Sequence, residues 1–228
     1  MKNGTEKYIG TVGYLSRLYD YCNAKLFDGE LVKPVITVQQ DAKNKTNGWW
    51  SVGKVWKWTE RIPAGVPVQS ENGEYVSDSA SVIDCEEHEL NMTAQQLNRP
   101  INEIAATLIH EMCHQYAQAN NMQDTSRAGN YHNKLFKQIA EKHGLHVECV
   151  ATIGWSHTTL TDDTAAIIAE FVKDNPDNVI YRMPVFKGQS VKTSSTRKYI
   201  CPCCGQSVRA TKAVNIMCAD CNELMHEE

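Results

Sequence analysis

Apolar residues recur at three-and-four spacing in four segments of the chain. This pattern predicts helices with one face on a core, over residues 11–27, 100–119, 131–143 and 162–172. Runs of β-branched and aromatic residues predict strands of one small sheet, over residues 35–38, 49–58 and 89–92. Asp28-Gly29 ends the first helix, Asn72-Gly73 marks a turn, and Asp162 or Asp163 is the expected cap of the last helix.

The size of the chain limits the number of domains. With 228 residues and 42% hydrophobic content, it can form one good core with a small accessory. Its formal charge of −4 is too mild to indicate nucleic-acid or membrane binding by itself. Because the N-terminus lacks an apolar leader and no later stretch is apolar for long enough to span a bilayer, we expect a cytoplasmic protein without membrane contact.

The predicted helix over residues 100–119 carries the sequence His110-Glu111-Met112-Cys113-His114. Two histidines four positions apart project from one helix face, so both can reach one Zn²⁺ ion. Glu111 lies beside that face and can take a proton from water as a general base. The alternative is a solvated polar face, but this helix is mostly apolar, which favours the metal site.

A catalytic zinc site needs a third protein ligand and leaves one position open. The downstream candidates are His132, His143, His146, Glu148 and His157. His132 would open the helix over residues 131–143 on its apolar side, whereas His143 would lie about 16 Å further along the same helix, too far to share the ion. His146 and His157 stay open as ligands, and Cys113 is interpreted as a small buried residue.

Two C-x₂-C pairs lie near the C-terminus, Cys201 with Cys204 and Cys218 with Cys221. Four thiolates at this spacing predict a closed tetrahedral zinc site with a structural role. Cys203 is left out, because the pairing of Cys201 with Cys204 places Gly205 where the tight turn requires it.

The region before and within this cysteine segment is basic. Residues 187–219 contain six lysines and arginines and no acidic residue, and residues 175–199 have the composition of a linker. The stretch is either a DNA-contacting surface or a solvated one. Two roles are also possible for the tryptophans of residues 49–58: they could stack on bases or pack against neighbouring strand residues. These tryptophans are Trp49, Trp50, Trp56 and Trp58.

Several segments together resemble one protein family. They are residues 19–31 (YDYCNAKLFDGEL), Glu89-Leu90-Asn91, the HEMCH sequence at 110–114, and Gly129-Asn-Tyr-His132 followed by Phe136. These residues resemble the SprT-like metalloproteases, a group that includes bacterial SprT proteins and the Spartan proteases acting on DNA–protein crosslinks. The resemblance implies that His132 is the third zinc ligand.

The combined expectation is an α+β fold: a zincin-like metalloprotease domain, with helices packed on a small β-sheet, followed by a small zinc ribbon. The expected boundaries are 8–160 for the protease domain, 161–195 for a helix and basic linker, and 196–228 for the ribbon. The expected function is a zinc endopeptidase with one catalytic and one structural Zn²⁺, acting on a protein substrate. The resemblance implies that DNA-associated proteins are among its substrates, with DNA contacts made by the linker and ribbon. The alternative is a non-catalytic, zinc-stabilised module that binds nucleic acid or protein.

Overall fold

The computed structural model describes residues 3–43, 45–63, 68–69, 75–76, 81–176, 179–183 and 196–228. Contacts divide the chain into two compact units, Met1–Met183 and Pro184–Glu228, and each is described by itself. The turn expected at Asn72-Gly73, and Lys187 and Lys192 of the basic stretch, lie outside the described residues. The domain boundaries expected after residues 160 and 195 remain predictions.

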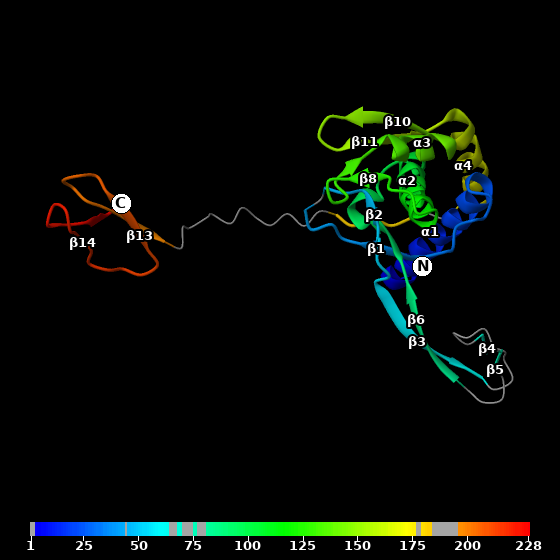
Figure 1. Cartoon of the computed structure of the whole chain (residues 1–228), viewed down its shortest axis with the longest axis horizontal. Helices are drawn as coiled ribbons and strands as arrows, with labels where there is room; N and C mark the ends of the chain where they lie inside the picture. Colours follow the sequence, from blue (N-terminus) through cyan, green and yellow to red (C-terminus); the bar gives the residue numbers. More distant parts are fainter. Residues whose placement is uncertain are drawn as a thin grey trace. The chain divides into compact units, whose positions relative to one another are not determined.

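The first unit is built around α2 (Ile101–Ala119), which lies among α1 (Gly4–Leu26), α3 (Lys134–Lys142) and α4 (Asp162–Asp174) (Figure 1). Leu108 and Met112 of α2 are fully buried, and so is Leu18 of α1. A hydrogen-bonded capping box of Asn3 and Glu6 begins α1 at Gly4, seven residues before the predicted start at residue 11, so that boundary was wrong. The helix ends where Asp28 and Gly29 adopt positive φ angles of 53° and 72°, as the sequence predicts.

A three-stranded sheet packs beside α2. It has the order β1-β7-β2, with β1 (Val35–Gln39) parallel to β7 (Glu89–Thr93) and β2 (Gly48–Trp50) antiparallel to β7. Every residue of β7 is buried, while β2 forms an edge of the described sheet. Helices packed on small sheets confirm the predicted α+β class.

The aromatic run over residues 49–58 forms strands on both sides of Gly53, as predicted, but these strands belong to two different sheets, so the prediction of one small sheet was wrong. Its second half belongs to β3 (Trp56–Ile62), which pairs with β6 (Ser81–Glu87) in a two-stranded arm (Figure 1). The strand is interrupted at residues 51–55 around Gly53, although the backbone N–H groups of Ser51 and Val55 still donate to the carbonyl oxygens of Glu89 and Glu87. A short pair of β4 (Val68–Gln69) and β5 (Tyr75–Val76), and a 3₁₀ turn η1 (Ala94–Gln96), complete this region.

A second sheet of four strands was not predicted from the sequence. Its order is β10-β11-β9-β8, formed by β8 (Thr125–Ser126), β9 (Tyr131–His132), β10 (Leu145–Val150) and β11 (Gly154–Leu160). The helix predicted from residue 131 therefore starts later, at Lys134. Asn133 caps it by accepting from the backbone N–H groups of Leu135 and Phe136, which leaves residue 132 extended.

The cap of α4 also differs from the prediction. The Thr161 side chain, and not that of Asp162 or Asp163, accepts the backbone N–H of Thr164. The two aspartates lie in the first turn, where negative charge stabilises the helix dipole. Phe171 of α4 packs edge-on against Tyr14 of α1 at 5.3 Å between ring centroids, so α4 belongs to the core of the first unit.

The second unit is a small β-structure. β12 (Arg197–Ile200) pairs with β13 (Ser207–Ala210) and β16 (His226–Glu227), and β14 (Met217–Cys218) pairs with β15 (Glu223–Leu224). Its buried cluster consists of Tyr199, Cys201, Cys218 and Met225. Two of these four side chains are cysteines, so apolar packing alone gives this unit little stability.

A membrane-spanning segment is not found among the described helices. None of them combines the length and the apolar composition that crossing a bilayer requires.

Candidate active site

Helix α2 presents the histidines of the HEMCH sequence on one face, as the sequence predicts. His110 and His114 are one turn apart, with ring centroids 5.0 Å from each other. Met112 and Cys113, between them in sequence, point into the core and are fully buried. The apolar face of α2 therefore packs in the core, and its polar face lines a cleft.

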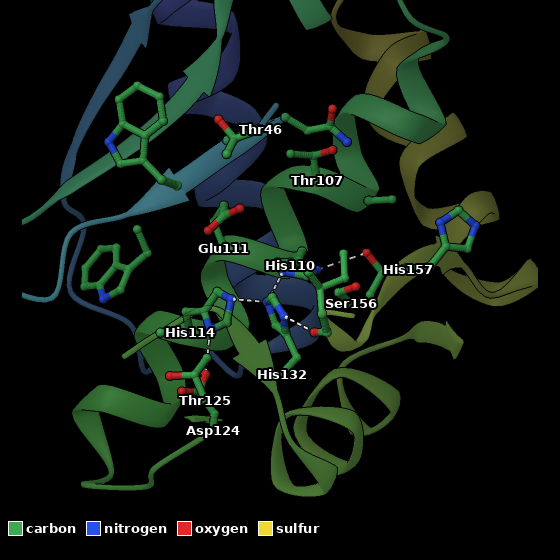
Figure 2. Close-up of a pocket in the computed structure, with 18 of the residues that line it drawn as sticks. Thr46, Thr107, His110, Glu111, His114, Asp124, Thr125, His132, Ser156 and His157 are labelled. Atoms are coloured by element: carbon green, nitrogen blue, oxygen red, sulfur yellow. Dashed lines mark hydrogen bonds and ion pairs between the residues drawn. The ribbon is translucent and has the colours of Figure 1, made fainter. Parts of the chain in front are cut away.

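His132 joins these two histidines from β9. Its Nε2 atom lies 3.1 Å from Nε2 of His110 and 3.1 Å from Nε2 of His114 (Figure 2). Zn–N bonds of about 2.0–2.1 Å in a tetrahedral site would separate two nitrogens by about 3.3 Å. The three nitrogens thus have nearly the spacing that one Zn²⁺ ion requires, and they form one of the two groups of potential metal ligands among the described residues.

The outer nitrogens of these rings test whether a cation fits. His114 Nδ1 lies 2.5 Å from Oδ2 of Asp124, and His132 Nδ1 lies 3.2 Å from the carbonyl oxygen of Ile153. Both oxygens accept, so each Nδ1 carries a proton, and whenever such a ring is neutral its lone pair is on Nε2. The lone pairs of the His114 and His132 Nε2 atoms would repel each other at their separation of 3.1 Å. A cation placed between these two atoms would be attracted by both lone pairs. The donor set is therefore consistent with zinc.

Three orienting groups were missed by the sequence analysis. They are the Asp124 carboxylate, the Ile153 carbonyl, and the Thr158 hydroxyl, which lies 3.1 Å from Nδ1 of His110. The sequence marks Asp124 only as part of a polar loop, and a backbone carbonyl leaves no sequence signal. Such outer partners fix the tautomer and orientation of metal-binding histidines.

Phe136 forms the floor of the site. Its ring centroid lies 4.6 Å from that of His110 and 4.7 Å from those of His114 and His132, and its side chain is fully buried. One ring therefore limits the rotation of all three imidazoles. This packing gives a physical reason for the four-residue step from His132 to Phe136.

Burial shifts the pKa values of the site. Burial lowers the pKa of His110 well below its usual range, and lowers that of His132 to about 4 with help from the charge of His114. Burial also opposes protonation of His114, but the Asp124 hydrogen bond and the charge of Glu111 outweigh it and raise that pKa. Two of the three rings therefore favour the neutral form that binds metal.

Glu111 lies beside the histidines, between α2 and β2 (Figure 2). Burial raises its pKa to about 7, while the charge of His114 and a backbone hydrogen bond from Trp50 act in the opposite direction. Gly48 of β2 allows this close approach, since a Cβ atom there would lie 2.7 Å from the Asn91 carbonyl oxygen and 3.5 Å from Cγ of Glu111. A carboxyl group with a pKa near 7 is suited to accept a proton at neutral pH.

The other candidate ligands lie elsewhere. His143 packs on Phe27, with ring centroids 4.1 Å apart, and its Nδ1 donates to the carbonyl oxygen of Leu26. His146 and Glu148 lie exposed on β10, and His157 lines the cleft without joining the three converging rings. The sequence analysis favoured His132 as the third ligand because it was expected to begin a helix. That reason was wrong, because His132 lies in strand β9.

Gly154 controls the position of His132. It has a φ of +74°, pairs with His132 across β11 and β9, and a Cβ atom there would lie 2.1 Å from the His132 carbonyl oxygen. We expect Gly154→Ala to lower the free energy of unfolding by about 2 to 5 kcal/mol, from backbone strain plus overpacking, and to weaken zinc binding by the histidines. Urea unfolding followed by tryptophan fluorescence reports on the first unit alone, because all five tryptophans lie in it.

Gly129→Ala is the matched control for this prediction. Gly129 has a φ of +85° but nothing within 4 Å of a Cβ atom, so only the backbone cost of about 1–2 kcal/mol should remain. If the two variants lose equal stability and bind zinc equally, Gly154 does not position His132.

The second group of potential ligands lies in the C-terminal unit. Cys201, Cys204, Cys218 and Cys221 place their sulfur atoms within 4.8 Å of one another. Backbone hydrogen bonds from Cys204 and Cys203 lower the pKa of Cys201 to about 7, which favours the thiolate that zinc requires. Cys203 is exposed and lies outside the group of four. This arrangement is compatible with a zinc ribbon.

The basic surface of this unit is partly neutralised. Arg197 forms an ion pair with Glu227 at 2.8 Å, and Lys198 forms one with Glu228. The basic stretch contains no acidic residue in sequence, but folding brings acidic residues from the C-terminal end next to it. Among the tryptophans, the indole N–H groups of Trp49 and Trp56 both donate to Glu89, which fixes the orientation of these two rings. Trp56 and Trp58 are nevertheless exposed, so they do not pack in the core.

The histidines and Glu111 line a cleft of about 1490 Å³. One wall is α2, a second includes residues 45–50 with the edge strand β2, and a third is residues 156–160 of β11. The cleft is large enough for several residues of an extended polypeptide.

Comparison with known proteins identifies the family. Residues 15–154, more than half of the chain, match the model of the SprT-like family. No curated protein and no solved structure shows a significant match. The matched segment contains the three converging histidines, Glu111 and Asp124, and membership supports a metallopeptidase-like role. The chain belongs to the SprT-like family, which confirms the resemblance seen in its sequence.

Proposed function

We propose that the protein is a zinc-dependent endopeptidase in which His110, His114 and His132 hold a catalytic Zn²⁺ ion. The single observation that carries this proposal is the convergence of three Nε2 atoms beside the buried carboxyl group of Glu111. A zinc ion at this position would supply Lewis-acid chemistry, because it lowers the pKa of water and polarises a carbonyl group. The protein groups supply orientation and proton transfer.

Glu111 is the proposed general base. Its raised pKa of about 7 suits it to take a proton from water and to return it to the leaving amine. The Trp50 backbone hydrogen bond and the packing of Gly48 hold the carboxyl group in place. Asp124 holds His114 through Nδ1, so the ring cannot turn its other nitrogen away from the site.

The cleft favours a polypeptide substrate. Strand β2, an edge of the described three-stranded sheet, runs along one wall, and an edge strand can offer backbone groups to an extended chain, although the Trp50 N–H already bonds to Glu111. The large open volume supports cleavage within a chain more than removal of a terminal residue.

A DNA-associated protein substrate is part of this proposal. It rests on the family and on the basic residues of the C-terminal unit, in which the four cysteines would hold a structural Zn²⁺ ion. Arg209 lines the same surface hollow as Arg197 and Lys198. Among the described residues, Arg197 and Lys198 form ion pairs and Arg209 does not. Phosphate contacts would have to compete with Glu227 and Glu228.

Removal of zinc tests the proposal. We expect the purified full chain to contain about two zinc ions and to cleave an unstructured protein such as casein, and a strong chelator should abolish cleavage. Cleavage should return with added Zn²⁺ and not with Mg²⁺, since imidazole nitrogens favour zinc. A full zinc complement without cleavage of casein or of a DNA-crosslinked protein would instead favour the non-catalytic binding module.

A further inference from the structure

Arg99 places a positive charge in the wall of the cleft that Glu111 also lines. Its Nη2 donates to Oγ1 of Thr107 at 3.0 Å, and its Nε donates to the carbonyl oxygen of Gln96 at 2.8 Å. Thr107 lies on α2 one turn before Glu111 and is itself buried. The guanidinium is therefore held in a defined position and is partly withdrawn from water.

No carboxylate of the described residues lies within ion-pair distance of this guanidinium. Both of its hydrogen-bond acceptors are neutral, and no ion pair involves Arg99 in the described part of the chain. A guanidinium has more N–H donors than these two bonds use, and their geometry matches a carboxylate. Burial lowers the pKa of Arg99, and the charge of Glu103 only partly opposes this. Such a group gains most from an anion supplied by a ligand.

We propose that Arg99 binds a carboxylate of the peptide substrate and so makes the protein selective for acidic sequences. This inference rests on the proposed endopeptidase function and names the substrate class of that site. From Thr107 to Glu111 the helix rises by about 6 Å, and an extended peptide advances about 3.3 Å per residue. The recognised carboxylate therefore lies about two residues from the bond that is cut.

The charges of the cleft favour one carboxylate over a nucleic-acid strand. Among the charged residues that line it, apart from histidines, the cations are Lys45 and Arg99 and the acids are Glu103, Glu111, Asp124 and Asp162. A strand with a phosphate at every nucleotide would meet these acids along the walls. A single carboxylate at Arg99 avoids that repulsion.

Peptide binding tests this inference without relying on catalysis. The probe is a set of fluorescein-labelled peptide pools bound to the zinc-loaded Glu111→Gln chain, followed by fluorescence anisotropy. One amidated pool contains Glu, a second contains Gln in its place, and a third is the Gln pool with a free C-terminal carboxylate. The third pool separates a terminal from a side-chain carboxylate, and a single-stranded oligonucleotide is a further arm.

We expect a carboxylate-bearing pool to bind about tenfold more tightly than the amidated Gln pool. Arg99→Gln should remove this preference and leave binding of the Gln pool unchanged. Arg61→Gln is the matched control, because Arg61 lies on the β3 arm outside the cleft and its loss changes the charge equally. Since loss of Arg99 also removes bonds to Gln96 and Thr107, Arg99→Glu provides a second variant, which should prefer a Lys pool over the Glu pool.

The inference is overturned if charged and neutral pools bind equally, or not at all, or if Arg99→Gln keeps the preference. It is also overturned if the oligonucleotide is the ligand whose binding depends on Arg99. Cleavage of the same pools by the wild-type chain separates this inference from the proposed function. Equal cleavage of both pools contradicts the Arg99 subsite alone, whereas binding selectivity without any cleavage contradicts the peptidase and leaves the subsite supported.

Discussion

Glu111→Gln should reduce peptide-bond cleavage by about 10² to 10⁴-fold, the range associated with loss of a general base, while the chain keeps its full zinc content. The amide has nearly the shape of the carboxyl group and its oxygen can still accept the Trp50 hydrogen bond. It cannot take a proton from water, and it is not one of the three converging ligands. The measurement is kcat/KM on casein-derived peptides together with zinc analysis of the same preparation.

Glu148→Gln is the matched control for this loss. Glu148 lies exposed on β10, outside the cleft, and carries the same chemical change within the same unit. Its cleavage rate should remain at the wild-type value. If Glu111→Gln cleaves as fast as Glu148→Gln, Glu111 is not the base, and if it loses zinc together with activity, its role is structural.

Cys218→Ser should unfold the C-terminal unit and reduce the zinc content from about two ions to about one. Cys218 is only 4% exposed and belongs to a buried cluster of four side chains, two of which are proposed zinc ligands. Structural zinc sites contribute about 10–16 kcal/mol of apparent binding energy in small domains, far more than a cluster of this size can supply by packing. Hydrogen exchange should show loss of protection over residues 196–228, while tryptophan fluorescence of the first unit stays unchanged.

Cys203→Ser provides the control, because Cys203 is exposed and lies outside the group of four sulfurs. It should keep two zinc ions and a protected C-terminal unit. Equal zinc loss from Cys203→Ser and Cys218→Ser would show that the set of four ligands is assigned wrongly. Retention of two zinc ions by Cys218→Ser would contradict a structural zinc site.

The helices and the first sheet were predictable where the signal is local. The apolar spacing of α2 and the Asp28-Gly29 stop of α1 depend on neighbouring residues, and here the prediction agrees with the structure. The start of α1 was predicted wrongly, because the apolar stripe begins only near residue 11 whereas the Asn3 cap begins the helix at Gly4. The start of α3 was not predictable from periodicity, because the Asn133 cap and the pairing of β9 with β11 override the helical pattern of residues 131–133. The sheet of β8 to β11 consists of short strands whose pairing is set by distant segments.

The sequence alone determined the parts of this protein that a few adjacent residues can build. Histidines four apart on an apolar helix share one face, and C-x₂-C pairs can close on one ion, because both geometries follow from local backbone structure. The tertiary structure decided which distant groups complete the cleft: His132, Asp124, the Ile153 carbonyl and Arg99. Their positions depend on how β9, β11 and η1 pack around α2, and packing between distant segments is not encoded in the spacing of neighbouring residues.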